Sequence, residues 1–148
     1  MPRIEREAHL VWEGNVARGT GSISAGSGAF DALGFSLPSR VGQAQGKTSP
    51  EELLAAAHGG CLGMSLAGEL TEIGHPAERI DLTCRIVMDE VEGQGHQIVG
   101  SVVTIAVRAP DLDEADLAEA TRLADDGCPF SALLKRAGAT VEVQAELA

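Results

Sequence analysis

Three cysteines and one histidine are the residue types in this sequence best suited to chemistry. The cysteines are Cys61, Cys84 and Cys128, and His58 stands three residues before the first of them. A thiol can act as a nucleophile or as a redox group once it is deprotonated, and it can also bind a metal ion. A histidine and a cysteine one helical turn apart are a possible pair of zinc ligands. Which of these roles applies depends on the elements that position the side chains.

Cys61 belongs to the segment Thr48–Ile73, which we predict to be one long helix. Ser49 is a natural N-cap, Pro50 fits the first helical position, and Glu52 completes a capping box with Ser49. The segment is apolar nearly all the way round, so we expect it to be buried at the centre of the molecule. A cysteine in a buried helix is most often a packing residue. The residues around Cys61 alone leave packing and chemistry about equally supported.

Two stripes of this helix have distinct compositions. One face carries only small residues and would let another backbone approach closely: Ala56, Gly60, Gly63 and Ala67. A narrow stripe is polar: Glu51, His58, Ser65 and Glu69. Glycine in mid-helix costs about 1 kcal/mol relative to alanine. We therefore expect tight packing of the small-residue face to compensate.

The other two cysteines have different settings. Cys84 lies on the apolar face of a regular strand, where we expect it to be an inert, buried, small hydrophobic residue. Cys128 directly precedes Pro129, so we expect it to be the N-cap of a short helix. The free N–H groups and the dipole of a helix N-terminus stabilise a thiolate, although two aspartates just before Cys128 act against this.

The remaining elements follow from hydrophobic periodicity and from turn residues. We expect strands at Arg3–Glu13 and Arg18–Ala25, a third strand or extended arm within Gly26–Arg40, a loop at Val41–Lys47, a hairpin of Arg79–Val91 with Ile98–Arg108, helices at Glu114–Asp126 and Phe130–Arg136, and a strand at Val141–Leu147. Leucines expected to point inward are Leu10 of the first strand, Leu117 and Leu123 of the first of these two helices, and Leu147 of the last strand. Helices and strands do not alternate strictly, so the order predicts an α+β fold, and the length predicts a single domain over residues 1–148.

The charge balance excludes some partners. With 11 basic and 22 acidic residues the formal net charge is −11, which disfavours nucleic acid and anionic membranes as partners. The first residues are charged and resemble no signal peptide, and the long helix carries too many polar and small residues to be a membrane span. We therefore expect a cytoplasmic protein, in which three cysteines are more plausible as free, metal-binding or redox thiols than as structural disulfides.

Several motifs, taken in chain order, resemble one known family. They are Trp12-Glu13-Gly14-Asn15, Arg18-Gly19-Thr20-Gly21, Thr48-Ser49-Pro50-Glu51-Glu52-Leu53, Ala56-Ala57-His58-Gly59-Gly60-Cys61 and Gly127-Cys128-Pro129-Phe130-Ser131. Together they resemble the OsmC/Ohr family of thiol-dependent hydroperoxide reductases, and the histidine before Cys61 suits the OsmC branch. Where the family pattern has asparagine, two alanines and an aromatic residue, this sequence has Ser49, Gly59-Gly60 and Leu62.

The resemblance implies a set of roles. Cys61 would be the peroxidatic cysteine, Cys128 the resolving cysteine, Arg18 the residue that activates the thiolate, and Glu51 the partner of that arginine. The implied fold is an antiparallel sheet packed on the central helix, in a two-fold intertwined homodimer. The implied substrates are organic hydroperoxides, with hydrogen peroxide a poorer one. The implied reductant is an external dithiol such as dihydrolipoamide or a lipoylated protein, with no bound cofactor or metal, in a role in oxidative or osmotic stress.

Helix geometry adds an expectation of its own. Glu51 and Cys61 are ten residues apart on one predicted helix, about 15 Å along its axis at 1.5 Å per residue. One chain's Glu51 therefore cannot easily serve its own Cys61. Two such helices packed antiparallel through the small-residue face would bring Glu51 of one subunit towards Cys61 of the other, which predicts a dimer with composite sites.

Two other classes of function remain open from the sequence. One is a non-enzymatic α+β dimer that binds a small ligand and keeps its cysteines for structure. The other is a zinc protein that uses His58 and Cys61, although no second paired-ligand motif is present.

Overall fold

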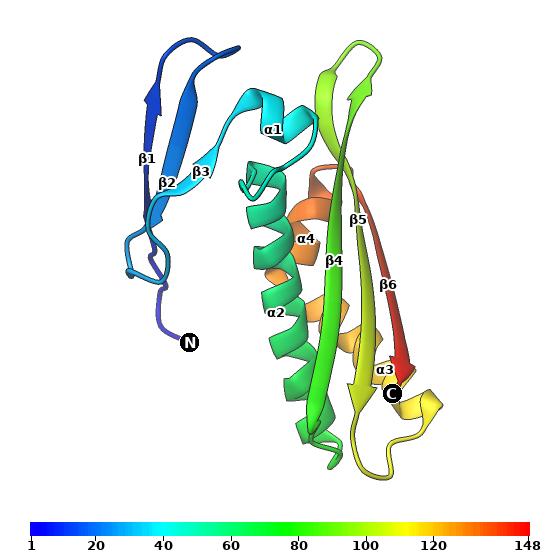
Figure 1. Ribbon diagram of the computed structural model, residues 1–148. Helices are drawn as coiled ribbons and strands as arrows, with labels where there is room; N and C mark the ends of the chain where they lie inside the picture. Colours follow the sequence, from blue (N-terminus) through cyan, green and yellow to red (C-terminus); the bar gives the residue numbers. More distant parts are fainter. The chain divides into compact units, whose positions relative to one another are not determined.

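The computed structural model describes residues 1–148, and its contacts divide the chain into two compact units, Met1–Pro50 and Glu51–Ala148. The elements in chain order are β1 Ala8–Glu13, β2 Thr20–Ala25, β3 Leu33–Phe35, α1 Leu37–Val41, α2 Pro50–Glu72, β4 Arg79–Val91, β5 Gly95–Arg108, α3 Glu114–Gly127, α4 Pro129–Arg136 and β6 Thr140–Leu147 (Figure 1). The α+β class predicted from the sequence is confirmed. That the two units act as a single domain stays a prediction.

The first unit is built on a three-stranded antiparallel sheet in the order β1-β2-β3. The Trp12 and Phe35 rings pack with their centroids 5.5 Å apart. Gly21 of β2 leaves the space that the Phe35 ring fills, because a Cβ at this position would collide with the ring. A glycine within a strand thus lets an aromatic ring cover the sheet.

Three predictions for the first unit are wrong. β1 begins at Ala8 rather than at Arg3, and Leu10, expected to point inward, is 54% exposed. Residues 37–41 form the short helix α1 instead of continuing an extended arm or loop. Ser36 caps α1 in a capping box with Ser39. Apolar residues alternate in the segment before Ser36, as in a strand, and this pattern favoured an extended arm over the helix that the capping box indicates.

The second unit contains the sheet β4-β5-β6 and the helices α2, α3 and α4. β4 and β5 form the predicted antiparallel hairpin, with an irregularity between Val87 and Met88. β5 and β6 pair in parallel, so the sheet is mixed rather than wholly antiparallel as expected. Parallel neighbours need a long crossover connection, and α3 with α4 provides it.

The core of the second unit lies between this sheet and its helices, which cover one face of it in Figure 1. The buried cluster consists of Leu62, Leu66, Leu70, Val103, Ile105, Val107, Leu112, Leu117, Ala120, Ala124 and Cys128. Leu117 is inward as predicted, whereas Leu123 and Leu147 are each 37% exposed and are not. The opposite face of the sheet carries polar residues such as Thr83, Thr104 and Gln144, and is exposed.

The long helix α2 has two contrasting faces. The closed face, His58, Leu62, Leu66 and Leu70, has no exposed surface. The open face, Ala56, Gly60, Met64 and Gly68, is exposed, and Met64 is 75% accessible. The prediction of one continuous helix is confirmed, but within one chain the helix is buried on one face only.

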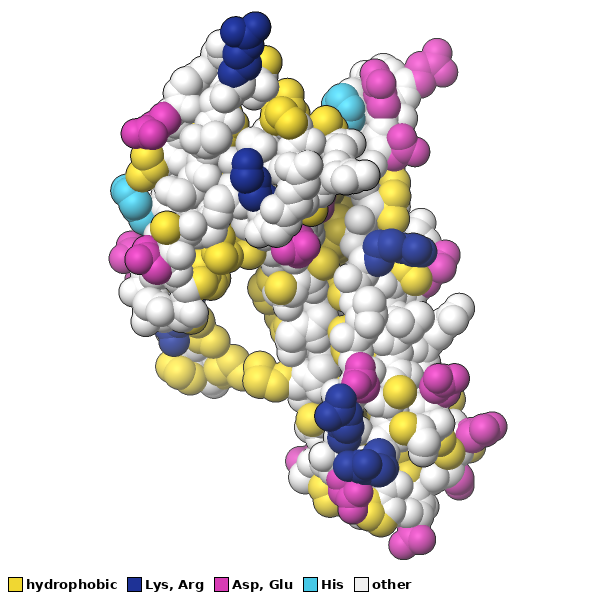
Figure 2. Space-filling model, in the orientation of Figure 1, with side chains coloured by type: hydrophobic (Ala, Val, Ile, Leu, Met, Phe, Trp, Pro, Cys, Tyr) yellow, Lys and Arg dark blue, Asp and Glu magenta, His cyan; other side chains and the backbone are white.

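Charged side chains occur over much of the face of the molecule that is seen in Figure 2. Acidic groups are scattered over the face seen in Figure 2. Ion pairs such as Arg79–Asp81 at 2.6 Å and Arg108–Glu78 at 3.1 Å are exposed, so each contributes little to stability. None of the helices has the length and apolar content needed to span a bilayer.

Candidate functional site

Cys128 is held at the junction between α3 and α4. It is the N-cap of α4 with extended backbone angles, its sulfur accepts a hydrogen bond from the Ser131 backbone N–H at 3.5 Å, and Pro129 follows at the first helical position. Its side chain has no exposed surface. The predicted N-cap role is therefore confirmed. A sulfur at this position receives the partial positive charge of the helix N-terminus.

Cys61 lies on α2 within hydrogen-bonding reach of Cys128, and both are free thiols. Burial, followed by the contact with Cys128, raises the pKa of Cys61. The Phe130 backbone N–H and the Ser65 hydroxyl, which donate to its sulfur, act in the opposite direction but are smaller effects. The second unit thus brings together two of the four site residues predicted from the sequence, in their reduced state.

A raised pKa leaves Cys61 mostly protonated near neutral pH, and a protonated thiol is a poor nucleophile. The groups that shift its pKa are a thiol, a hydroxyl and a backbone N–H, together with burial; none of them is a cation. Rapid attack by Cys61 would therefore require a positive charge supplied from outside this immediate environment.

The other two predicted site residues belong to other parts of the chain. Arg18 belongs to the first unit, in the turn between β1 and β2, where its backbone N–H donates to Asn15 Oδ1 at 2.9 Å. It is exposed and borders a hollow of about 450 Å³ together with Ser36, Ser39 and Lys47. Glu51 lies in the first turn of α2. Because α2 is continuous to Glu72, Glu51 is separated from Cys61 by about 15 Å of helix.

His58 has a position that the sequence did not reveal. It was expected in the polar stripe of α2, but it has no exposed surface. Its Nδ1 is 2.8 Å from Ser101 Oγ on β5, and its Nε2 is 2.8 Å from Ser131 Oγ on α4. Burial lowers the pKa of His58, against the smaller opposing effect of Asp125. Both ring nitrogens are occupied, so His58 cannot join Cys61 as a metal ligand without breaking one of these bonds.

Cys84 is likewise not the simple buried hydrophobic residue that the sequence suggested. It is half-buried, and its Sγ lies 3.4 Å from Ser101 Oγ and 3.7 Å from His58 Nδ1. The available sequence signal was Ser101 itself, because it occupies an inward position of β5 where Val103, Ile105 and Val107 follow in the same register. A polar residue in an apolar register indicates a buried hydrogen-bond partner.

Three of the residues that depart from the family pattern, Gly59, Gly60 and Leu62, have different structural consequences. A Cβ on Gly59 would lie 2.9 Å from Leu82 Cδ2 and 3.2 Å from Cys84 Cβ, so glycine allows β4 to approach α2 closely. A Cβ on Gly60 would meet nothing within 4 Å. Leu62 has no exposed surface and belongs to the core. The residue after Cys61 therefore packs inward and does not line an outward pocket.

An open groove of about 580 Å³ runs between α2 and β4. Its lining is mostly small or apolar: Glu52, Ala55, Ala56, Gly59, Gly60, Gly63, Met64, Ile80, Leu82, Thr83 and Cys84. The groove contains three of the four residues predicted to form a close-packing face.

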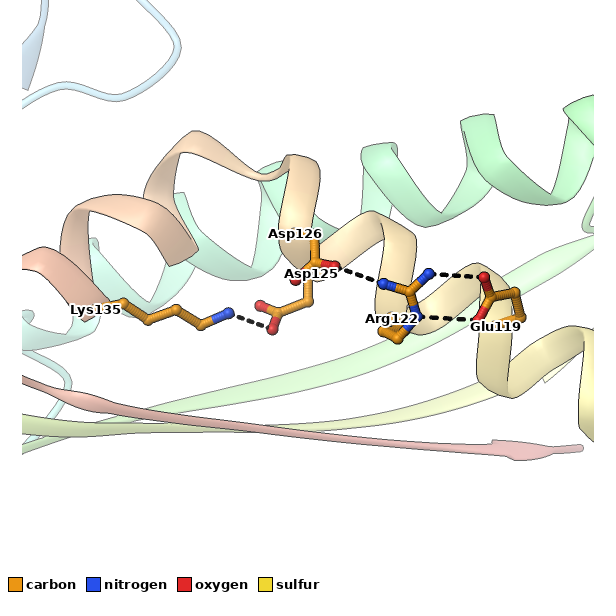
Figure 3. Close-up of polar contacts among 5 residues, drawn as sticks. All are labelled: Glu119, Arg122, Asp125, Asp126 and Lys135. Carbon is orange, nitrogen blue, oxygen red and sulfur yellow. Dashed lines mark hydrogen bonds and ion pairs between the residues drawn. The ribbon is translucent and has the colours of Figure 1, made fainter.

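Ion pairs reinforce the junction that carries Cys128. Lys135 Nζ of α4 lies 2.6 Å from Asp125 Oδ2 of α3, and Arg122 binds both Glu119 and Asp126 along α3 (Figure 3). The Asp125 carboxylate is only 18% exposed, and its Oδ1 is buried without a partner. The Lys135–Asp125 pair links the two helices on either side of Cys128.

Comparison with known proteins shows the family to which this chain belongs. The family model for OsmC-like proteins matches residues 42–144. Peroxiredoxin OsmC of Escherichia coli is 33% identical over 132 residues, which are 89% of this chain and 91% of the relative. The crystal structure of the organic hydroperoxide resistance protein OhrB of Bacillus subtilis has a TM-score of 0.67 and 26% identity, covering 96% of this chain and 98% of that one. The structure of an OsmC-like protein of unknown function from Vibrio cholerae shares the fold, with a TM-score of 0.75 and 14% identity. The match covers 99% of this chain and 100% of that one. The chain belongs to the OsmC-like family.

Proposed function

We propose that this protein is a thiol-dependent peroxidase that reduces organic hydroperoxides. The observation that carries the proposal is the pair of free thiols, Cys61 and Cys128, within hydrogen-bonding reach at the N-terminus of α4. Two relatives support it through their names, one a peroxiredoxin and the other an organic hydroperoxide resistance protein.

The proposed reaction uses each thiol once. The Cys61 thiolate attacks the terminal oxygen of the hydroperoxide, the O–O bond breaks, and the alcohol leaves after taking up a proton, so Cys61 becomes a sulfenic acid. The Cys128 thiolate then attacks the Cys61 sulfur, and the hydroxide that leaves is released as water. An external dithiol reduces the resulting disulfide by two thiol–disulfide exchanges.

Arg18 supplies the missing positive charge in this proposal. Arginine keeps its charge at any working pH and can bind both a thiolate and a peroxide oxygen. Glu51 would orient the guanidinium through an ion pair. Because Glu51 and Cys61 are far apart on one α2, we place this pair at the Cys61 of a second subunit.

A homodimer formed through the groove would make such composite sites. The open face of α2 offers Gly60 with no atom within 4 Å of its absent Cβ, so a second helix could approach there closely. A two-fold axis would run the two helices antiparallel and place each Glu51 near the other subunit's Cys61.

The apolar residues near Cys61 favour a substrate with an organic substituent. Leu54 and Ala57 precede Cys61 by about two turns and one turn and are half-buried, and Met64 is 75% exposed on the following turn. Such a surface binds an alkyl or acyl group better than it binds hydrated hydrogen peroxide. We therefore expect a higher kcat/KM for cumene hydroperoxide than for hydrogen peroxide.

The test is a titration of free thiols with cumene hydroperoxide. Wild type should lose two thiols per chain rapidly, Cys61→Ser should not react, and Cys128→Ser should stop at a sulfenic acid that a dimedone probe traps. Cys84→Ser is the matched control and should behave as wild type. Regeneration by dihydrolipoamide, compared with thioredoxin, identifies the class of reductant.

One result would contradict the proposal directly. If wild type and all three variants react equally slowly, Cys61 is an ordinary packing thiol, and a ligand-binding dimer with structural cysteines becomes the better explanation. A zinc stoichiometry of one per chain that is lost in Cys61→Ser would instead favour a metal site.

A further inference from the structure

The buried polar cluster around His58 joins three elements of the second unit. His58 on α2 is hydrogen-bonded to Ser101 on β5 and to Ser131 on α4, each at 2.8 Å. None of the three side chains has exposed surface. A neutral imidazole has one donor nitrogen and one acceptor nitrogen, so it satisfies both serines without a buried charge.

Ser131 connects this cluster to the buried thiol. It is the third residue of α4, and its backbone N–H is the donor to Cys128 Sγ at 3.5 Å. The His58–Ser131 bond therefore ties the first turn of α4, which carries Cys128, to α2. His58 is three residues before Cys61 on that same helix, about 4.5 Å along its axis. This hydrogen bond, together with the one from the Phe130 backbone N–H to the Cys61 sulfur, links the two cysteine-bearing elements.

The ion pair at the α3–α4 junction does not link α4 to α2. The Lys135–Asp125 pair holds α4 to α3, but neither residue belongs to α2. In contrast, the His58 ring reaches α4 from the helix that carries Cys61. On its other side it bonds Ser101 in the sheet, where Cys84 Sγ is 3.4 Å from the same hydroxyl.

We propose that His58, acting through Ser131, is the positioning residue that sets Cys128 for attack on the sulfur of Cys61. This inference rests on the proposed function, because it concerns the second, resolving step of that reaction. A disulfide requires the two sulfurs to approach to about 2.05 Å with a restricted torsion angle. Misplacement of a reacting group by about 1 Å can cost about 100-fold in rate.

The resolving step can be measured without any peroxide. 5,5′-Dithiobis(2-nitrobenzoate) transfers one thionitrobenzoate to the Cys61 thiolate and releases another. The Cys128 thiolate then attacks Cys61 Sγ, forms the disulfide and expels the second thionitrobenzoate. The rate of the first thionitrobenzoate release reports on Cys61 alone, and the rate of the second reports on Cys128. Peptide mass mapping distinguishes both from labelling of Cys84.

Two pairs of matched variants isolate the His58–Ser131 bond. The amide of His58→Gln reaches to about the position of Nε2 and can keep the bond to Ser131, whereas the amide of His58→Asn stops near Nδ1 and can keep only the bond to Ser101. Ser131→Ala and Ser101→Ala each remove one 2.8 Å bond to His58 from an equally buried serine. Both serine variants remove a buried hydroxyl, and only Ser131 is also hydrogen-bonded to Cys128. Ser101→Ala additionally removes the 3.4 Å contact with Cys84 Sγ.

We expect the second release to slow at least about 10-fold in His58→Asn and Ser131→Ala. It should stay within about threefold of wild type in His58→Gln and Ser101→Ala, and the first release should change little in all four. In peroxide turnover the two slow variants should also inactivate faster, because the Cys61 sulfenic acid persists long enough to be oxidised to sulfinic acid.

The proposal is overturned if Ser101→Ala slows the second release as much as Ser131→Ala, or if neither variant slows it. Thermal unfolding of each variant shows whether it is folded, and the glutamine variant provides the comparison if alanine at Ser131 is not tolerated. Should wild type show the two releases but no reaction with hydroperoxide, the peroxidase function fails while the role of His58 stands.

Discussion

The closed and open faces of α2 differ in composition and in what surrounds them. Leu62, Leu66 and Leu70 on the closed face have no exposed surface, whereas Gly60 and Met64 on the open face are exposed. The closed face is covered by the chain's own sheet and helices, and large side chains fill the space there. The open face has small residues and no such cover. One face of α2 therefore belongs to the core, and the other could accommodate the same helix of a second subunit.

Cys61 lies at the boundary between the two faces. It is half-buried, packs against the core cluster and lies beside Cys128. A thiol wholly on the closed face would be inaccessible to a peroxide, and one wholly on the open face would lack its partner thiol. The boundary position provides both contact with Cys128 and access from outside.

The largest contrast expected between the faces is in stability. Leu66→Ala leaves a cavity in the core and should lower the free energy of unfolding by about 2–5 kcal/mol. Met64→Ala, two residues away on the open face, should change it by less than about 0.5 kcal/mol at protein concentrations where the chain is monomeric. Urea unfolding measures both, and equal losses would show that the two faces do not differ in this way.

The next contrast concerns association. Gly60→Leu fills the groove without any clash within its own chain, so we expect it to weaken dimerisation about 100-fold while leaving the fold intact. Analytical ultracentrifugation gives the dissociation constant. Gly68→Leu is the matched control, because Gly68 is on the open face but outside the groove. A Gly60→Leu protein that remains as dimeric as wild type would contradict an interface through this groove.

The reactivity of the boundary thiol should depend on an arginine of the first unit. Arg18→Met should lower the second-order rate with cumene hydroperoxide about 10-fold or more and move the alkylation profile of Cys61 to higher pH, because loss of a cation disfavours the thiolate. Arg40→Met, in the last turn of α1, is the comparison. If Arg40→Met produces these changes and Arg18→Met does not, the activating role belongs to Arg40.

The smallest expected effect is a pH dependence at the closed face. The pKa of His58 is lowered below its ordinary value of 6.5 by burial, while Asp125 raises it and Lys135 lowers it by smaller amounts. As pH falls below 6.5 the unfolded chain takes up a proton that the folded chain does not, so His58 makes the protein less stable in acid. Between pH 7.5 and 5.5, wild type should lose up to about 1 kcal/mol more than His58→Gln in urea unfolding. If wild type and His58→Gln lose the same free energy of unfolding over this range, the pKa of His58 does not differ between the folded and unfolded chain.

Local signals in the sequence predicted the elements that carry the two thiols. The proline start and the glycine end of α2, and the Cys-Pro sequence before α4, act within a few residues, so the bounds of α2 and the N-cap at Cys128 were predictable. The resemblance to the family indicated that the two cysteines form a pair, which no local pattern could have shown.

Features that depend on distant parts of the chain were not predictable in this way. His58 is polar and was therefore assigned to an exposed stripe, but its partners are 43 and 73 residues away in the sequence. The parallel pairing of β5 and β6 also depends on the whole crossover rather than on either strand. The exposure of Leu10 cannot be predicted from alternation, because alternation reports only that a strand has two faces.

The crossover between β5 and β6 has a thermodynamic consequence for oxidation. Cys128 lies within this connection, and a bond to Cys61 would close a covalent ring that encloses the entire β4–β5 hairpin. A ring of this size removes enough freedom from the unfolded chain to stabilise the fold by about 4 kcal/mol in the chain-entropy treatment. Formation of the disulfide would then raise the free energy of unfolding, and its reduction would lower it again. The resistance of the protein to heat and proteolysis would therefore depend on the fraction of molecules that are oxidised.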